Sequence, residues 1–413
     1  MHILINAYAC NPYQGSEPGV GWGFLYEISK YHKVTVIIEK NEFESKINHW
    51  IRDNPELLKN VNFNFIPRKS IGILEKIYPP SYYWTYQKWQ YDVLNYVKKN
   101  INLEEIDIVH QLTMVGFREP GYLWKLKKPF IWGPVGALSY FPLKFLPALN
   151  LKGKITYLVY NCLQFMHLNF KIRTKKAADK SQKIIAATAQ DQLEIKKRFK
   201  KDAVLIEEVG LPLDLYDFSI LDLKSRELTQ PIEIVWSGLL IHRKALSIAL
   251  YSLAKLDNQK KWKLHIVGDG PLKNDMVNLS KSLGIYHNCI FHDWIEREHN
   301  LAIMKKSHLM LITSLRDLTS TVTIEAMGCG LPIICFDHCG FSGVVNDSNG
   351  IKIPLVSYEH ALDAFQLAIQ KMFDEEFRFN LAKGAVLNSK KYIWKEKIEL
   401  LNEIYENISS KNN

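Results

Sequence analysis

Residues 308–337 comprise the sequence HLMLITSLRDLTSTVTIEAMGCGLPIICFD, two apolar runs separated by a helical pattern. Both runs are short and rich in branched apolar residues, which is typical of buried β-strands. Between them, a Thr or Ser of residues 319–321 can cap a helix, and Gly328 can end it. Pro332 prevents the helix from continuing. A strand, a helix and a second strand in this order predict a parallel pair joined by a crossover helix.

The same alternation extends over the rest of the chain. Strand patterns occupy residues 2–9, 33–39, 61–67, 107–113, 128–134 and 183–188, and then 232–238, 262–268 and 288–293. A length of 413 residues exceeds what one hydrophobic core usually serves. We therefore predict an α/β protein with two Rossmann-like, doubly wound domains at residues 1–211 and 231–390. An amphipathic helix at 392–407 is expected to pack back on the first domain.

Composition and cysteine usage point to a cytoplasmic location. The N-terminal strand lacks the basic start and cleavage site of a signal peptide, and no uncharged apolar run reaches eighteen residues. The six cysteines are scattered and form no Cys-x-x-Cys pair, which favours a reducing compartment. Cys335, His338 and Cys339 lack a second pair of ligands nearby, so we predict no zinc site.

Positive charge is concentrated in the first half of the chain. Net charge is +10, and no acidic residue lies between Glu119 and Asp179, where ten Lys or Arg and eleven aromatic residues fall. This asymmetry predicts an anionic partner, and residues 143–170 are apolar enough to lie at an anionic membrane surface. The alternative is that these cations form an ordinary solvated face and that the aromatic residues belong to the core.

Two adjacent cations follow the strand at 232–238. This strand ends in Gly238, and the next helix is expected to begin at Arg243 and Lys244. Ligands of doubly wound sheets bind at the carboxyl ends of strands, so the two cations can hold a diphosphate. Cations at a helix start oppose the helix dipole, which favours this interpretation over a solvated helix start.

Two glycines and two carboxylates complete the pattern. Gly268 belongs to a Gly-Asp-Gly-Pro turn that permits close approach of a ligand, a weak signal when taken alone. Asp317 lies in the loop before the helix of residues 321–328. Glu325 lies inside that helix among apolar residues, where a carboxylate needs donors such as ribose hydroxyls. The alternative is that Glu325 pairs with a nearby cation and that Asp317 is a loop residue.

These three elements resemble the C-terminal half of glycosyltransferase family 4, a family of retaining enzymes with the GT-B fold. The family has a G-x-L-x-x-R-K-G element, a GxGP turn, and two Glu separated by seven residues, the second within E-A-M-A-x-G-x-P. This chain has GLLIHRKA, VGDGP and D-LTSTVTI-E-AMGCGLPII. At the start, ACNPYQGSEPGVGW resembles the family's Gly-rich loop, and DIVHQLT resembles its strand ending in His. The resemblance implies two domains that face a central cleft.

For the donor, the resemblance implies a nucleoside diphosphate sugar. Arg243 and Lys244 would grip its diphosphate beside the glycine loops of Gly238 and Gly268. Glu325 would bind the ribose, and Asp317 would contact hydroxyls of the transferred sugar.

The resemblance assigns further roles to backbone groups and to the first domain. Backbone N–H groups of Leu318, Thr319 and Ser320 would hold phosphate and sugar oxygens. Gly15 would let its loop close over the phosphates, and His110 would lie near the reacting carbon. A lone His at a strand end is often a satisfied core residue instead.

Two residues depart from the family pattern. Ala245 replaces a Gly, and Asp317 replaces the first Glu, so its reach is one methylene shorter. These departures are the support for one alternative, a noncatalytic sugar-nucleotide-binding or membrane scaffold relative.

The resemblance predicts a hexosyltransferase that acts on a glycan or lipid-linked acceptor in cell-surface polysaccharide assembly. Asp-x-Asp, a frequent metal-binding motif of other glycosyltransferases, is missing, so we expect no metal or other cofactor. A nicotinamide-dependent oxidoreductase would need GxGxxG after the first strand, which ACNPYQGSEPG does not provide. No nucleic-acid-binding module is present, so nucleic acid is not an expected partner.

Overall fold

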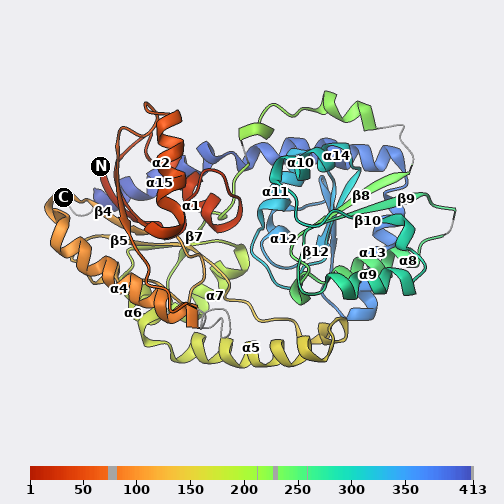
Figure 1. The fold of residues 1–413 in the computed structure, drawn as a ribbon, viewed down its shortest axis with the longest axis horizontal. Coiled ribbons are helices and arrows are strands. Elements are labelled where there is room, and N and C mark those ends of the chain that lie inside the picture. Colours follow the sequence, from red (N-terminus) through yellow and green to blue (C-terminus); the bar gives the residue numbers. More distant parts are fainter. Residues whose placement is uncertain (73–80, 212, 227–230, 258, 411–413) are drawn as a thin grey trace. The chain divides into compact units, whose positions relative to one another are not determined.

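The structure is a computed structural model that describes residues 1–72, 81–211, 213–226, 231–257 and 259–410 (Figure 1). The chain forms two compact units. Unit 1 comprises residues 1–138, 166–208 and 394–413, and unit 2 comprises residues 139–165 and 209–393.

Unit 1 is built on a parallel seven-stranded sheet with the order β3-β2-β1-β4-β5-β6-β7. Its strands are β1 (His2–Asn6), β2 (Lys33–Glu39), β3 (Val61–Ile66), β4 (Ile108–Gln111), β5 (Phe130–Val135), β6 (Lys183–Ala186) and β7 (Ala203–Leu205). The connecting helices are α1 (Ser16–Ile28), α2 (Lys40–Asp53), α4 (Tyr82–Asn100), α6 (Ile172–Lys180) and α7 (Ala189–Phe199). The central strands are buried along their whole length, as expected for a parallel sheet covered on both faces.

Unit 2 is built on a parallel six-stranded sheet with the order β10-β9-β8-β11-β12-β13. Its strands are β8 (Ile232–Ser237), β9 (Trp262–Val267), β10 (Cys289–Phe291), β11 (Leu309–Ile312), β12 (Ile333–Phe336) and β13 (Gly350–Ile353). Its helices are α8 (Leu246–Ala254), α9 (Lys273–Ser282), α10 (Arg297–Lys306), α11 (Thr321–Gly328), α12 (Phe341–Val344), α13 (Tyr358–Lys371) and α14 (Glu375–Ser389). From β8, the strands β9 and β10 are added on one side of the sheet, and β11, β12 and β13 are added on the other. Doubly wound sheets bind ligands at this switch in strand order, here between β8 and β11.

Short 3₁₀ helices occupy several connections. They are η2 (Leu103–Glu105), η3 (Leu123–Lys125), η4 (Leu143–Ala148), η5 (Leu213–Leu215), η6 (Ile220–Arg226), η7 (His242–Lys244), η8 (Tyr286–Asn288) and η9 (Lys390–Tyr392). Helix α5 (Leu151–Phe170) contributes its first fifteen residues to unit 2 and its last five to unit 1. No helix in the described ranges is long and apolar enough to cross a membrane.

The C-terminal helix α15 (Trp394–Ser409) belongs to unit 1, although it lies far in sequence from the other residues of that unit. The ring of Trp394 meets that of Phe24 of α1 edge-on, with centroids 5.2 Å apart. The Lys397 ammonium donates to a carboxylate oxygen of Glu207 over 3.0 Å. Without α15, the buried Phe24 ring and the partly exposed Glu207 carboxylate would lose these partners.

The predicted fold class is confirmed: both units are doubly wound α/β domains with parallel sheets. The sequence patterns missed β7 and β13, each of which lies at one of the two edges of its sheet. The unit boundaries also differ from residues 1–211 and 231–390, because residues 139–165 pack with unit 2.

Candidate functional site

The turn after β8 carries Arg243 and Lys244. The two cations lie in the 3₁₀ helix η7 and not at the start of the α-helix, because Ala245 adopts a left-handed backbone with φ of +48° and α8 starts at Leu246. This corrects the predicted helix start. The Arg243 carbonyl oxygen accepts from the N–H of Leu315 over 2.8 Å, which ties the turn to the loop after β11.

Asp317, in that loop after β11, pairs with both cations. Its carboxylate lies 2.5 Å from Lys244 Nζ and 3.1 Å from Arg243 Nη1. Burial alone raises the pKa of Asp317, but Lys244 and Arg243 outweigh it and hold the pKa below its ordinary value. The carboxylate is therefore ionised at neutral pH, and the three side chains form a cluster with a net charge of about +1.

The glycine loops after β8 and β9 pack directly on each other. Gly268 has φ of +133°, and a Cβ on it would lie 2.0 Å from the carbonyl oxygen of Gly238. The N–H of Leu240 donates to the Asp269 carbonyl over 2.9 Å. Gly268 thus has a structural reason to be glycine, in addition to the ligand contact expected from the sequence.

Residues 318–320 lead into α11. The N–H of Leu318 donates to the Asp317 carboxylate over 3.1 Å, and Ser320 has φ of +66°. Thr319 is fully buried, and its carbonyl accepts from the Thr323 hydroxyl over 2.6 Å. Helix α11 begins at Thr321 at the carboxyl edge of the sheet, so its first N–H groups add a partial positive charge beside the cations.

Glu325 is buried in α11 and has a cationic partner. Its Oε1 accepts from Nε of Arg297 over 2.6 Å. The two terminal nitrogens of Arg297 donate to the carboxylate of Asp214 over 3.0 and 3.1 Å. Burial raises the pKa of Glu325, and Arg297 opposes that rise without cancelling it. The alternative of pairing with a nearby cation is thus what the geometry supports, while ribose binding stays a prediction.

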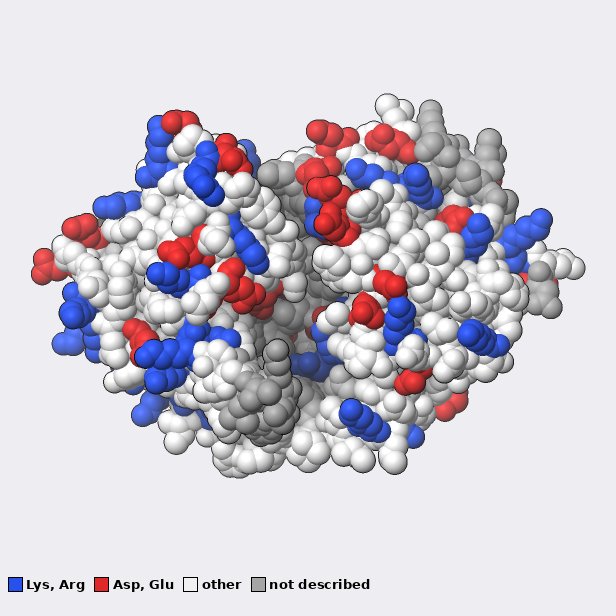
Figure 2. All heavy atoms as spheres, in the orientation of Figure 1, with Lys and Arg blue, Asp and Glu red and all other residues white. Residues whose placement is uncertain are grey.

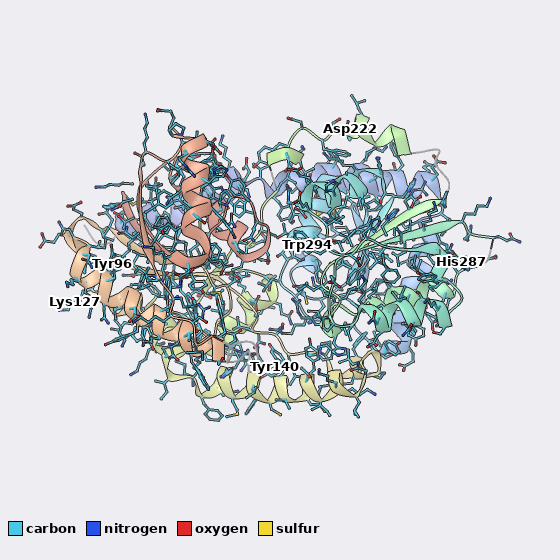
Figure 3. The ribbon with its side chains drawn as sticks, viewed as in Figure 1. Tyr96, Lys127, Tyr140, Asp222, His287 and Trp294 are labelled. Atoms are coloured by element: carbon cyan, nitrogen blue, oxygen red, sulfur yellow. The ribbon has the colours of Figure 1, made fainter. Side chains whose placement is uncertain are left out.

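An exposed indole lies close to this part of unit 2. Trp294 follows β10 and is 72% exposed (Figure 3). The carbonyl of its neighbour Asp293 accepts from the N–H of Gly268 over 2.7 Å, so Trp294 lies next to the glycine loop. Three residues later Arg297 opens α10 and contacts Glu325.

In unit 1, Gly15 is the N-cap residue of α1, with a negative φ of −79°. Its loop is ordered by Asn11, whose N–H donates to the Pro18 carbonyl over 3.0 Å. In the first turn of α1, the Glu17 carboxylate accepts from the N–H of Val115 over 2.8 Å. Burial raises the pKa of Glu17 to about 7.

His110 is a core residue of β4. Its side chain is fully buried, its Nε2 lies 2.7 Å from the Gly133 carbonyl, and its Nδ1 lies 2.7 Å from the Tyr405 hydroxyl. The carbonyl can only accept, so Nε2 carries the proton and Nδ1 accepts from Tyr405. Burial lowers the pKa of His110 to about 4, so the ring is neutral. Because both ring nitrogens have partners, the geometry supports the alternative of a satisfied core histidine, while a position near the reacting carbon stays a prediction.

The structure therefore groups the candidate residues of unit 2 at the carboxyl edge of one sheet, and it gives Gly15 and His110 to unit 1. The sequence patterns missed Arg297, Asp214 and Trp294, and no motif marks them. Within the described ranges, no three His, Cys, Asp or Glu side chains converge in a way that could hold a metal ion.

Residues 220–387 match the sequence model of the family described as "Glycosyl transferases group 1". An uncharacterised glycosyltransferase of Methanocaldococcus jannaschii is 23% identical over 39% of this chain. The N-acetyl-alpha-D-glucosaminyl L-malate synthase of Bacillus anthracis is 29% identical over 34% of this chain. These alignments span only 41% and 36% of the lengths of the two relatives.

Solved structures with the GT-B fold are similar over nearly the whole chain. HepE from Anabaena, solved in complex with UDP, has a TM-score of 0.64 at 15% identity and covers 98% of this chain and 100% of its own. The sucrose-phosphate synthase of Thermosynechococcus elongatus has a TM-score of 0.65 at 15% identity and covers 99% of both chains. At this level of identity the likeness establishes the fold.

Proposed function

We propose that this protein is a retaining glycosyltransferase that moves a hexose-type sugar from a nucleoside diphosphate sugar to a glycan or lipid-linked acceptor. The observation that carries the proposal is the cluster of Arg243, Lys244 and Asp317 beside the start of α11. The cluster lies inside the segment that matches group 1 glycosyltransferases. A fixed cationic site next to the N-terminus of a helix suits a diphosphate.

The chemistry places opposite demands on the two halves of the donor. As the bond from the anomeric carbon to the phosphate oxygen breaks, positive charge develops on the sugar and negative charge on the leaving diphosphate. Arg243, Lys244 and the N–H groups at residues 318–320 would stabilise that negative charge, and preorganised donors of this kind are usually the largest catalytic term. The acceptor oxygen attacks from the same face, and its proton passes to the leaving diphosphate.

Asp317 holds the cations in position before the donor binds. In the proposal, the diphosphate shares Arg243 and Lys244 with Asp317, and the carboxylate turns its remaining acceptor capacity to sugar hydroxyls. An ionised carboxylate makes strong hydrogen bonds to hydroxyl donors. The low pKa of Asp317 keeps it in this form.

The nucleoside would occupy the neighbouring loops. Glu325, oriented by Arg297, would accept from the ribose hydroxyls, as the resemblance to the family implies. Trp294 offers an exposed aromatic face beside Arg297 and the Gly268 loop, on which a base can stack. The base would thus lie on the far side of the ribose from the diphosphate.

The same proposal places the enzyme in the cytoplasm, at the inner face of the membrane, in assembly of a cell-surface polysaccharide. Net charge of +10 and the acid-free stretch between Glu119 and Asp179 support an anionic surface as its surroundings. Cations do the work that a metal does in other glycosyltransferases, so no cofactor is needed.

The test is a screen of the purified protein against a panel of nucleotide sugars, with release of nucleoside diphosphate as the readout. One or a few donors should release nucleoside diphosphate, and the sugar product should retain the donor's anomeric configuration by NMR. Binding of nucleotide sugars without release from any donor, with acceptors present, would favour the noncatalytic relative instead.

A further inference from the structure

Helix α5 presents apolar side chains to solvent along one face. Six of these residues, spread over the length of the helix, are between 52% and 74% exposed: Leu151, Ile155, Val159, Phe165, Met166 and Phe170. Their spacing keeps them within one continuous face of an α-helix. We call these six residues the outward face of α5. Solvent-exposed apolar surface that is contiguous over a whole helix marks an interaction site.

The opposite face of α5 is fixed to unit 2 by specific contacts. The Tyr157 ring stacks on Phe141 with centroids 4.2 Å apart, and the Asn161 side chain bonds both backbone groups of Phe141 over 2.9 Å. The Arg316 guanidinium lies 4.3 Å from the centroid of the Tyr160 ring. These contacts prevent the helix from rotating its apolar side chains inward.

The start of the helix lies directly against the candidate donor site. Gly153 approaches the His242 ring so closely that a Cβ would lie 2.8 Å from it. His242 belongs to the same turn as Arg243, and Arg316 precedes Asp317. The outward face is therefore carried by a helix whose other side supports the loops of the site.

Positive charges flank the outward face at both ends. Lys152 and Lys154 lie in the first turn of α5, where cations oppose the helix dipole, and exposed Lys175 and Lys176 follow its end. Neither α5 nor the sequence from 120 to 178 contains an acidic residue. The surface combines apolar and aromatic anchors with cations only.

This charge pattern decides between two occupants. Paired helices of two copies usually place acids against bases beside their apolar seam, and α5 has no acid to offer. A second copy would bring lysines against lysines. An anionic bilayer instead supplies both an apolar layer and negative headgroups.

We infer that the outward face of α5 docks on an anionic phospholipid surface, with the helix lying parallel to the membrane. Figure 2 shows mainly uncharged atoms along the edge where Figure 1 places α5. Such helices bury their apolar face roughly 5–10 Å into the boundary between headgroups and acyl chains. The helix does not cross the bilayer, in keeping with the absence of a spanning helix in the described ranges.

Cys162 supplies a direct probe. It is exposed on α5, and the other five cysteines are buried. A polarity-sensitive fluorophore on Cys162 of the full chain should brighten and shift to the blue on mixed phosphatidylcholine and phosphatidylglycerol vesicles. Lipids with a nitroxide near the headgroup should quench it. Pure phosphatidylcholine vesicles should give no change, and added salt should weaken binding, since each lysine near the surface strengthens it about fivefold.

Substitutions test the face itself in a vesicle flotation assay with unlabelled protein. Ile155→Asp with Phe165→Asp should weaken flotation with anionic vesicles by more than about tenfold, because each loses a buried apolar anchor. Leu193→Asp with Leu387→Asp makes the same charge change at residues that are 70% and 61% exposed on other helices, and should float like the wild type. Circular dichroism verifies that each variant is folded.

Four outcomes would overturn the inference. Wild-type protein that fails to float with anionic vesicles excludes the membrane as occupant, whatever its transferase activity. Equal loss in both double variants assigns binding to charge alone. A concentration-dependent dimer in light scattering, abolished by Ile155→Asp with Phe165→Asp, makes a second copy the occupant. If that variant does not fold, unquenched fluorescence of wild-type labelled Cys162 on anionic vesicles overturns the inference alone.

Discussion

Replacing Asp317 by Asn should make the protein less stable and make it bind nucleoside diphosphate more tightly. The carboxylate now joins two ion pairs, at 2.5 Å to Lys244 and 3.1 Å to Arg243, among side chains that are 11–26% exposed. Breaking a fully buried pair costs about 3–5 kcal/mol and an exposed pair about 0–1 kcal/mol. For these partly buried pairs we expect a loss of about 2–3 kcal/mol in the free energy of unfolding.

The gain in affinity follows from removing a negative charge beside the anion. A carboxylate roughly 5 Å from a phosphate oxygen, in a medium between protein and water, repels it by about 1–2 kcal/mol. Asp317→Asn should therefore tighten binding of nucleoside diphosphate by about 5- to 30-fold. Lys244→Gln should act in the opposite direction, weakening binding by about 10- to 100-fold through loss of a charge-assisted donor.

Calorimetric titration of nucleoside diphosphates and inorganic pyrophosphate measures both effects, and urea unfolding measures stability. The matched control is the exposed ion pair of Lys255 and Asp363, 2.6 Å apart in the same unit. Lys255→Gln and Asp363→Asn should leave affinity unchanged and lower stability by less than about 1 kcal/mol. If Asp317→Asn and Lys244→Gln shift affinity in the same direction or not at all, the cluster is a structural ion pair and not a diphosphate site.

Three further predictions concern the nucleoside, the metal and pH. Glu325→Gln should weaken nucleoside diphosphate binding by about 5- to 30-fold and leave pyrophosphate binding unchanged, since a neutral acceptor makes about half the hydrogen bond; equal nucleoside diphosphate affinities by calorimetry would assign Glu325 to its ion pair with Arg297. Sugar transfer should survive EDTA in the release assay, and abolition with rescue by Mg²⁺ or Mn²⁺ would contradict metal independence. Glu17 has a folded pKa of about 7 against an ordinary 4.5. Its contribution to the free energy of unfolding is therefore complete below pH 4.5 and is lost as pH rises through 7, a decrease of about 1–3 kcal/mol. Glu17→Gln should flatten that part of the stability profile in urea unfolding, and parallel wild-type and variant profiles would refute the raised pKa.

The sequence indicates most of the fold, because buried parallel strands appear as near-continuous branched apolar runs. The patterns missed β7 and β13, which are only three and four residues long and each lie at one edge of a sheet. Residues 139–165 pack with unit 2 although they precede part of unit 1 in the chain. An apolar pattern shows that a segment is buried, but it does not show which of the two hydrophobic cores the segment packs against.

The site was predictable where a motif marks it and not where only folding brings residues together. The loop position of Asp317 and the start of α11 follow from capping residues and glycines. Arg297 lies 28 residues before Glu325 in sequence, and only the packing of α10 against α11 pairs them. The buried environment of His110 depends on Tyr405, at the far end of the chain, which no local pattern connects with β4.

The most direct test of the central claim is the rate of nucleoside diphosphate release from the preferred nucleotide sugar, compared between wild type and the variants Arg243→Ala and Lys244→Ala. Loss of one donor that stabilises transition-state charge typically costs about 2.7–4 kcal/mol, so each variant should be slower by about 10²–10³-fold. Both should remain folded by circular dichroism, and Lys255→Ala should keep the wild-type rate. Near-wild-type release by both site variants, or no release by the wild type from any nucleotide sugar, would contradict the account.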